Sequence, residues 1–211
     1  MTTGEALRPG RIYAIADAEA LAPRGLAASA LAMAQAGIMT IQLRAKSLQD
    51  DFLYAEAERC LRLLAGWPGT LWIDDRVDLA RMLPFSGVHL GRGDLPAAET
   101  RRLVAPTLRI GMSTHDLEQL CEADRDAAVD WVALGPIFTT RSKREPDPPV
   151  GLGSLRAGRI RTSKPLIAIG GIGLANVASV LESGADSAAV LSAVCFGDIA
   201  RNCRELLSAA A

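Results

Sequence analysis

Aromatic residues, histidines and cysteines are scarce in this chain, and its net charge is close to zero. Phe, Trp and Tyr together form 4% of the 211 residues, so we expect a core built from Ala, Leu, Val and Ile. A net charge of −1 provides no global basic field that would hold nucleic acid, and no polybasic or amphipathic membrane-binding segment stands out. The two histidines argue against a histidine-based metal site. With 49% hydrophobic and 22% charged residues, the composition is that of an ordinary soluble globular protein.

The cysteines and the first residues indicate the compartment. Cys60, Cys121, Cys195 and Cys203 are irregularly spaced and include no CxxC pair, which argues against a disulfide framework and against a zinc site. The opening segment MTTGEALRPGR contains no apolar signal core. No apolar run approaches the ~20 residues needed to span a membrane. We therefore expect a cytoplasmic protein with no membrane partner.

Short apolar runs alternate with helix-period segments along the whole chain. The runs are rich in Val, Ile or Leu and end at Gly, Asp or Ser, as strands buried on both faces do. Strands are expected at 12–17, 39–44, 70–75, 87–91, 108–113, 131–136, 166–171 and 187–192. Helices are expected at 25–37, 47–66, 77–83, 96–104, 114–124, 153–159, 174–186 and 198–211. The sequence SLQD, which opens the segment 47–66, resembles a capping box in which Ser47 precedes the helix.

About eight strand–helix units in one chain predict a single (β/α)8 TIM barrel over residues 1–211, with parallel strands and right-handed crossovers. Residues 1–10 are expected to form a flexible N-terminal extension. A doubly wound open sheet is the alternative. A nucleotide-binding sheet of that kind would carry GxGxxG after its first strand, and IADAEAL offers nothing similar.

Polar side chains follow most of the predicted strands, at the end of a parallel barrel where active sites lie. Gln42, Arg44 and Lys46 alternate along the second strand, so all three face the same side. Charges that point into a barrel need a partner, because an unpaired buried charge costs several kcal/mol. Arg and Lys together suit a diphosphate, since Arg binds it bidentately and Lys acts as a point charge. We therefore expect an anion to bind at this end.

Asp75 and Asp94 follow the third and fourth strands and are hard oxygen ligands. Mg²⁺ typically takes one or two carboxylates and completes its shell with water and substrate phosphate. The alternative is that the two carboxylates cap helices or pair with Arg76 and Arg92. The sequence alone leaves both readings open.

Glycines close the seventh strand, and Ser192 ends the eighth. Gly170 and Gly171 leave backbone N–H groups bare, and barrels often bind phosphate with the loops after strands seven and eight. A phosphate site is therefore expected here. His89 and His115 are given no general-base role, and no Ser–His–Asp order or nucleophile elbow is present.

Seven motifs together resemble the thiamine-phosphate synthase family. They are QLRAK, DDRVDLA, GVHLGRGDL, GMSTH, GPIFTTRSK, AIGGI and AVLSAV, in the order and spacing of that family. The resemblance covers nearly the whole chain. It implies a (β/α)8 barrel that couples 4-amino-5-hydroxymethyl-2-methylpyrimidine diphosphate with a thiazole phosphate, giving thiamine phosphate and diphosphate.

The resemblance also implies roles for individual residues. The pyrimidine diphosphate would be held by Gln42, Arg44, Lys46, Asp74, Ser113 and Lys143. Mg²⁺ would be held by Asp75 and Asp94. The thiazole phosphate would be held by Thr140, Ser142, Gly171, Leu191 and Ser192. Arg44, Lys46, Ser113 and Lys143 would contribute to catalysis. The partners are small molecules, and the sequence allows a homo-oligomer without determining the oligomeric state.

The chain departs from the family pattern at a few positions. Asp74 stands where the family usually has Asn, and a carboxylate there would repel diphosphate unless it became an extra metal ligand. Arg92 stands where Gln is common, and Ala45 where Glu is common. Ser142 replaces a usual Thr but keeps the hydroxyl. Asp74 is the departure that most threatens activity.

Three other functions compete with the synthase. The thiazole tautomerase branch of the same fold lacks the Thr-x-Thr-Lys loop and carries His where Pro136 stands here, so both features favour the synthase. A non-catalytic thiamine-phosphate-binding relative would show degenerate site residues, and Asp74 is the only candidate for such a residue. A barrel isomerase of another phosphorylated metabolite would need a clear acid–base pair.

Overall fold

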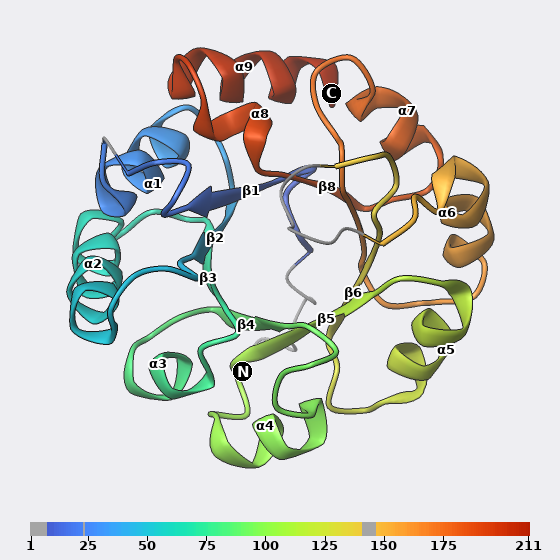
Figure 1. Ribbon diagram of the computed structural model, residues 1–211, viewed down its shortest axis with the longest axis horizontal. Coiled ribbons are helices and arrows are strands. Elements are labelled where there is room, and N and C mark those ends of the chain that lie inside the picture. The colour runs from blue at the N-terminus through green and yellow to red at the C-terminus, as the bar shows by residue number, and fades with distance from the viewer. Residues whose placement is uncertain (1–7, 23, 141–146) are drawn as a thin grey trace.

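Eight parallel strands close into a barrel in the computed structural model (Figure 1), which describes residues 8–22, 24–140 and 147–211. Neighbours in the chain are neighbours in the barrel, and β8 pairs with β1 to close it. The strands are β1 Ile12–Asp17, β2 Thr40–Arg44, β3 Thr70–Asp74, β4 Gly87–Leu90, β5 Arg109–Thr114, β6 Trp131–Leu134, β7 Leu166–Ile169 and β8 Ser187–Val190. The expected (β/α)8 barrel is confirmed, and the open-sheet alternative is wrong.

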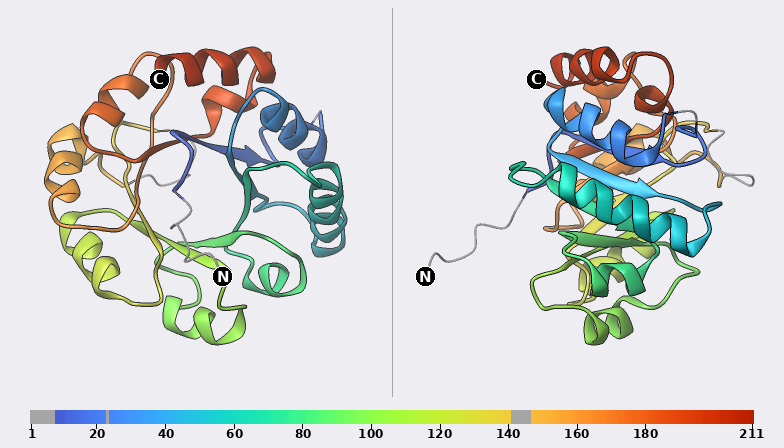
Figure 2. Two further views of the ribbon diagram at one scale, coloured as in Figure 1. Left: turned by 180° about the vertical axis from the view of Figure 1, so that it is seen from behind. Right: turned by 90° about the vertical axis from the view of Figure 1, so that its left-hand side faces the viewer.

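The helices form a ring around the barrel, seen end-on in Figure 1 and from the side in Figure 2. They are α1 Leu26–Gln35, α2 Asp50–Leu63, α3 Val77–Met82, α4 Ala97–Leu103, α5 Leu117–Arg125, α6 Gly151–Arg159, α7 Val177–Glu182, α8 Ser192–Cys195 and α9 Ile199–Ala209. Aspartates begin two of them. The Asp116 side chain accepts from the Gln119 N–H (2.8 Å), and that of Asp198 accepts from the Arg201 N–H (3.0 Å).

Several helix boundaries differ from the sequence expectation, and two of the helix starts have a local cause. The second helix begins at Asp50 rather than after Ser47, so the capping-box prediction is wrong. Two carboxylates in its first turn, Asp50 and Asp51, favour that start because they face the positive end of the helix dipole. The helix expected from 174 begins at Val177. The side chain of Asn176 accepts from the Gly173 N–H and donates to the Gly171 carbonyl, which holds the preceding residues in a turn.

The eighth strand also ends earlier than expected. It stops at Val190, and Ser192 opens the single turn of α8 instead of continuing the strand. The expectation of a flexible extension falls mostly on residues 1–7, outside the described residues. Of the remainder, Pro9 is buried and the Gly10 N–H donates to Thr40 Oγ1 at 3.0 Å.

The core has two parts of different chemistry. The larger part lies between the sheet and the helices and is aliphatic, as the composition predicts. The smaller part fills the inside of the barrel and is built around Tyr13, Trp72 and Trp131. The two indoles stack with centroids 4.2 Å apart, and Tyr13 meets Trp131 edge-on at 6.3 Å. Three of the nine aromatic side chains therefore lie together inside the barrel, which the composition did not predict.

Glycines on neighbouring strands make room for large inward-facing side chains. Gly87 pairs with Trp72, and a Cβ at Gly87 would lie 2.5 Å from the indole. Gly111 pairs with His89, and a Cβ there would lie 2.6 Å from Nδ1 of the imidazole. Both contacts are too short for a real Cβ, so these positions require glycine.

Ion pairs connect neighbouring segments at the amino-terminal ends of the strands, on the side of the barrel opposite the cavity described below. Arg101 contacts Asp130 (2.5 Å) just before β6, and Arg159 contacts Asp186 (2.6 Å) just before β8. Each carboxylate also accepts a hydrogen bond from a strand N–H. Asp130 accepts from Ile110 of β5, and Asp186 accepts from Leu166 of β7. Polar contacts at this end of a barrel serve stability rather than chemistry.

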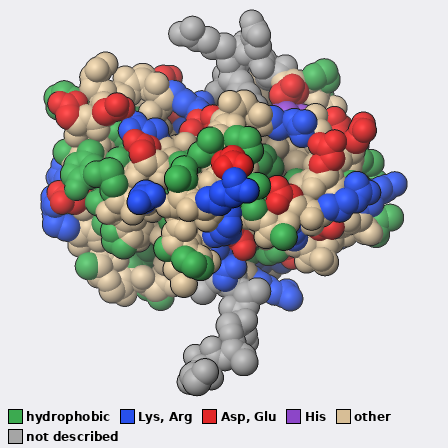
Figure 3. Space-filling model, turned by 90° about the horizontal axis from the view of Figure 1, so that it is seen from below, with side chains coloured by type: hydrophobic (Ala, Val, Ile, Leu, Met, Phe, Trp, Pro, Cys, Tyr) green, Lys and Arg blue, Asp and Glu red, His purple; other side chains and the backbone are tan. Residues whose placement is uncertain are grey.

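The outer surface carries both signs of charge. Lys and Arg side chains are interspersed with Asp and Glu on the face drawn in Figure 3. Within the described ranges, no helix is both long and apolar enough to cross a bilayer.

Candidate active site

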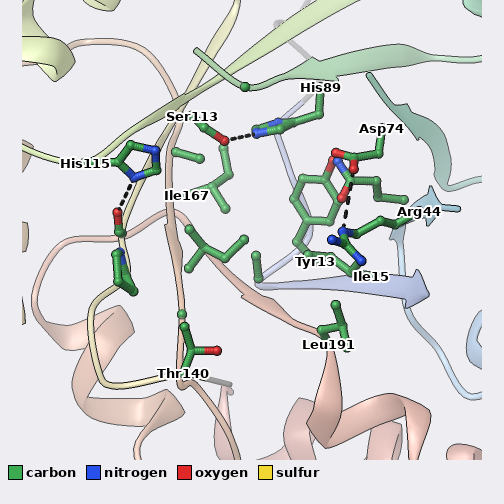
Figure 4. Close-up of a pocket in the computed structure, with 18 of the residues that line it drawn as sticks. Tyr13, Ile15, Arg44, Asp74, His89, Ser113, His115, Thr140, Ile167 and Leu191 are labelled. Carbon is green, nitrogen blue, oxygen red and sulfur yellow. Dashed lines mark hydrogen bonds and ion pairs between the residues drawn. The ribbon is translucent and has the colours of Figure 1, made fainter. Parts of the chain in front are cut away.

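A cavity of about 410 Å³ opens at the carboxyl ends of the strands (Figure 4). Tyr13, Ile15 and Ile167 belong to the inner core and also line the cavity, where Figure 4 shows them close together. The wall of the cavity contains eleven of the thirteen residues that the sequence assigned to substrates and metal. These are Gln42, Arg44, Lys46, Asp74, Asp75, Asp94, Ser113, Thr140, Gly171, Leu191 and Ser192. The other two, Ser142 and Lys143, lie outside the described residues.

Arg44 is fixed between two carboxylates. Its Nη1 contacts Asp17 Oδ2 on β1, and its Nε lies 3.7 Å from Asp74 Oδ2 on β3. Asp17 is buried, pairs in register with Arg44, and accepts a second hydrogen bond from the Ala20 N–H at 3.0 Å. The strand order β1–β2–β3 therefore aligns an acid, a base and an acid across three strands.

Lys46 lies between Asp74, the last residue of β3, and Asp75, which follows it. Its Nζ contacts Asp75 Oδ2 and lies 3.5 Å from Asp74 Oδ2. Asp75 has a φ of 59°, in the left-handed region that Asp tolerates better than most residues. Its N–H donates to the His89 carbonyl at 2.8 Å, which anchors this turn to β4. The turn aims the Asp75 carboxylate into the cavity.

Asp94 comes from the loop after β4 and faces the same cavity. Its Oδ2 accepts from the Gly91 N–H at 2.7 Å, which closes the sequence Gly91-Arg92-Gly93-Asp94 into a tight turn. Asp75 and Asp94 thus reach one cavity from adjacent strands. No group of three or more His, Cys, Asp and Glu side chains forms a ready-made metal site in the described part of the chain.

The two histidines lie in the cavity wall and are both engaged. His89 Nε2 and Ser113 Oγ share a hydrogen bond of 2.9 Å, drawn in Figure 4. Burial lowers the pKa of His89, against the opposing pull of Asp74 and Asp94, so this imidazole is neutral at pH 7. His115 Nδ1 donates to the Gly135 carbonyl at 2.8 Å. Both rings are held as structural parts of the wall.

The loops after β6 and β7 are packed tightly against each other. Gly171 has a φ of 65°, and a Cβ at this position would lie 2.6 Å from the Thr139 carbonyl oxygen. Gly171 therefore has to be glycine for two independent reasons. The close approach brings Thr140 to the same wall as Gly171, with Ser192 at the start of α8 beside them.

The described wall of the cavity carries more negative than positive charge. Arg44, Lys46 and Arg92 supply three cationic groups, against the four carboxylates of Asp74, Asp75, Asp94 and Asp147. The formal charge of these seven side chains sums to −1. A phosphorylated substrate would meet repulsion here unless further positive charge accompanied it.

The sequence matches the family model described as thiamine monophosphate synthase over residues 12–194. The chain belongs to this family. Curated thiamine-phosphate synthases are similar over nearly their whole length. That of Koribacter versatilis is 44% identical, covering 88% of this chain and 89% of its own, and that of Chloroflexus aurantiacus is 40% identical, covering 94% and 93%.

Solved structures agree with the family. A thiamine phosphate pyrophosphorylase from Pyrococcus furiosus superposes with a TM-score of 0.85 at 30% identity, covering 97% of this chain and 96% of that one. A tryptophan synthase α-subunit from the same organism superposes with a TM-score of 0.70 at 16% identity, covering 95% and 99%. The second likeness shows the barrel fold alone.

Two residues in or next to the cavity were missed by the sequence reasoning. Asp17 forms an ion pair with Arg44 and does not itself line the cavity, and Tyr13 lines the cavity. Both carried a signal, because Tyr13, Ile15 and Asp17 alternate along β1 and therefore share its inward face. The strand end at Asp17 was recognised, but its pairing with Arg44 depends on the register of β1 with β2.

Proposed function

We propose that this member of the thiamine monophosphate synthase family joins 4-amino-5-hydroxymethyl-2-methylpyrimidine diphosphate to a thiazole phosphate, giving thiamine phosphate and diphosphate. One observation carries the proposal: eleven separately predicted residues line a single cavity at the carboxyl ends of the strands. The names of the similar proteins support the same reaction. They do not favour the tautomerase, the non-catalytic binder or another isomerase.

The reaction exchanges one bond for another at a single carbon. The bond between the pyrimidine methylene carbon and the diphosphate oxygen breaks, and its electron pair leaves with the diphosphate. The thiazole nitrogen then donates its lone pair to the electron-poor carbon. This chemistry needs neutralisation of the leaving charge and alignment of the nucleophile more than it needs a protein base. The two histidines of the wall are engaged in hydrogen bonds, which is compatible with that requirement.

The residues that line the two sides of the cavity are proposed to bind different substrates. Arg44 and Lys46 face the position proposed for the diphosphate, with Gln42 and Ser113 beside them to bind the pyrimidine. The β7 loop at Gly171, with Thr140 and Ser192, would bind the thiazole phosphate and so orient its nitrogen. The roles of Ser142 and Lys143 stay predictions, as does a cytoplasmic location.

Asp75 and Asp94 fit a hard divalent cation. A cationic group, the ammonium of Lys46, already contacts the Asp75 carboxylate, so the position attracts positive charge. Two carboxylates match the number that Mg²⁺ takes from a protein when substrate oxygens and water complete its shell. Bound there, Mg²⁺ would neutralise charge on the diphosphate.

The test is a direct assay of the purified protein. Both substrates are supplied with Mg²⁺ or with excess EDTA, and thiamine phosphate and diphosphate are quantified by mass spectrometry. We expect equal amounts of both products with Mg²⁺ and almost none with EDTA. If no product forms in the presence of Mg²⁺, the synthase reaction is ruled out. Incubation with the thiazole phosphate alone, followed by chromatography of its isomers, tests the tautomerase separately.

A further inference from the structure

Arg92 lies at the tip of the turn that carries Asp94 and lines the main cavity. It also lines a second, shallower cleft of about 250 Å³ between α4 and α5, which shares Gly91 and Asp94 with the main cavity. A Cβ at Gly93 would meet no atom within 4 Å, so this turn is not packed against the body of the protein. Arg92 therefore lies between the main cavity and the second cleft, and its side chain has space on both sides.

The partner of Arg92 in this structure lies on the cleft side. Its Nη1 contacts Glu122 Oε2 of α5 at 3.3 Å, and the two side chains are 49% and 55% exposed. An ion pair between two such exposed, flexible side chains contributes little, because water screens it and both side chains lose freedom. The contact with Glu122 is therefore easily exchanged for a better one.

The other cations of the described wall are more firmly held. Arg44 contacts Asp17 and Asp74, and Lys46 contacts Asp74 and Asp75. Each shares its charge with two carboxylates, and those carboxylates are at most 20% exposed. The carboxylate that contacts Arg92 therefore competes less strongly with a bound diphosphate than the carboxylates that contact Arg44 and Lys46.

We infer that Arg92 is a further binding residue for the diphosphate leaving group, and that Glu122 holds its guanidinium aside until the diphosphate binds. The inference rests on the proposed function. A guanidinium presents a fork of N–H donors that matches two oxygens of a phosphate, which a half-exposed carboxylate in water cannot equal. Rotation of the Arg92 side chain exchanges Glu122 for diphosphate oxygens beside Asp94.

Two substitutions separate this role from a merely structural ion pair. Arg92→Gln removes the ligand, whereas Glu122→Gln removes only its competitor. A structural pair predicts the same effect for both, because either change breaks it. The proposed exchange predicts opposite effects on diphosphate affinity.

The measurement is the dissociation constant of inorganic diphosphate with Mg²⁺, by isothermal titration calorimetry on the full chain. We expect roughly tenfold weaker binding for Arg92→Gln, the range for a hydrogen bond to a charged group. We expect about twofold to threefold tighter binding for Glu122→Gln, the range for an exposed pair. The matched controls Arg102→Gln and Glu99→Gln break an exposed pair on α4 and should leave the constant unchanged.

Opposite shifts in the two variants, with unchanged controls, support the inference. Shifts in the same direction, no shift in Arg92→Gln, or no diphosphate binding by the original protein would overturn it. Because binding is measured without turnover, the two proposals fail separately. A protein that binds diphosphate through Arg92 but forms no thiamine phosphate would contradict the proposed reaction alone. A protein that forms thiamine phosphate while Arg92→Gln binds diphosphate normally would contradict only the role of Arg92.

Discussion

Arg44 Nε and Asp74 Oδ2 lie 3.7 Å apart on neighbouring strands, and Lys46 Nζ approaches the same carboxylate oxygen to 3.5 Å. This relationship explains how the protein accommodates an acid where its family usually has an amide. Two cations share the Asp74 charge, so the carboxylate is compensated although its side chain is only 13% exposed. In return, Asp74 occupies cations that a diphosphate would otherwise use.

Asp74→Asn is therefore expected to strengthen binding of the pyrimidine diphosphate. The change removes one negative charge from the described wall and releases Arg44 and Lys46. We expect a decrease in KM for this substrate of about tenfold, corresponding to roughly 1.4 kcal/mol. Steady-state kinetics at fixed Mg²⁺ measures it, with Glu99→Gln as a surface control. A large decrease in kcat with unchanged KM would contradict this prediction and indicate that Asp74 is a required ligand.

Asp17→Asn is expected to act in the opposite direction. Asp17 does not line the cavity but positions Arg44 through the ion pair across β1 and β2. The amide keeps an acceptor for the Ala20 N–H, so the local turn is preserved while the charge is lost. We expect KM for the pyrimidine diphosphate to rise about tenfold, and the free energy of unfolding to decrease by about 1–3 kcal/mol.

Circular dichroism and urea unfolding check that Asp17→Asn remains folded. Asp17→Glu serves as the conservative variant and should recover part of the lost affinity. A positioning role fails if the KM of Asp17→Asn equals that of the original protein while its stability alone falls.

Tyr13→Phe is expected to stabilise the protein without ligand. The Tyr13 hydroxyl is buried and has no hydrogen-bond partner within bonding geometry among the described residues, although Gln42 approaches it. Burial raises the pKa of Tyr13 well above its usual value, with the Asp74 charge adding to the effect. Removing a buried hydroxyl that lacks a partner relieves about 1 kcal/mol. Differential scanning calorimetry should show a higher Tm for this variant and almost no change for Tyr54→Phe on α2.

Alkaline pH is expected to destabilise the protein through its buried thiols. Burial raises the pKa of Cys60 and of Cys203 to about 12, and that of Cys195 to about 11, from a usual value of 9.0. Between pH 9 and pH 11 the unfolded chain loses these protons and the folded protein keeps them. The unfolded state therefore binds fewer protons, and the free energy of unfolding falls as pH rises, by up to about 1.4 kcal/mol per pH unit for each thiol.

Urea unfolding at several pH values between 8 and 11 measures that slope. Cys203→Ala removes one of these buried thiols and should make the slope shallower by the contribution of one thiol. Equal slopes in Cys203→Ala and the original protein would contradict the assignment.

Much of the fold was predictable because it depends on local pattern. The alternation of apolar runs with helical segments predicted all eight strands and the closed barrel. Boundaries were less accurate where a side chain controls the backbone. Asn176 delays α7, and the paired carboxylates Asp50 and Asp51 move the start of α2. Those interactions depend on geometry that a periodicity does not contain.

The candidate site was predictable as a set of residues and less so as a set of contacts. Strand ends predicted which polar groups converge, because parallel strands place their carboxyl ends together. The pairing of Arg44 with Asp17 and Asp74 required the register between three strands, and the aromatic filling of the barrel required knowing which residues face inward at the same height.

The barrel, the face that carries the site and the family could all be inferred from the sequence, since each follows from the order and period of residues along the chain. Only the tertiary structure decided which charges neutralise one another. From the sequence, the Asp74 carboxylate was expected to repel the diphosphate. In the fold, its charge is compensated by Arg44 and Lys46. The physical reason is that electrostatic energy depends on distance in space, and residues 17, 44 and 74 become neighbours only when the strands pair.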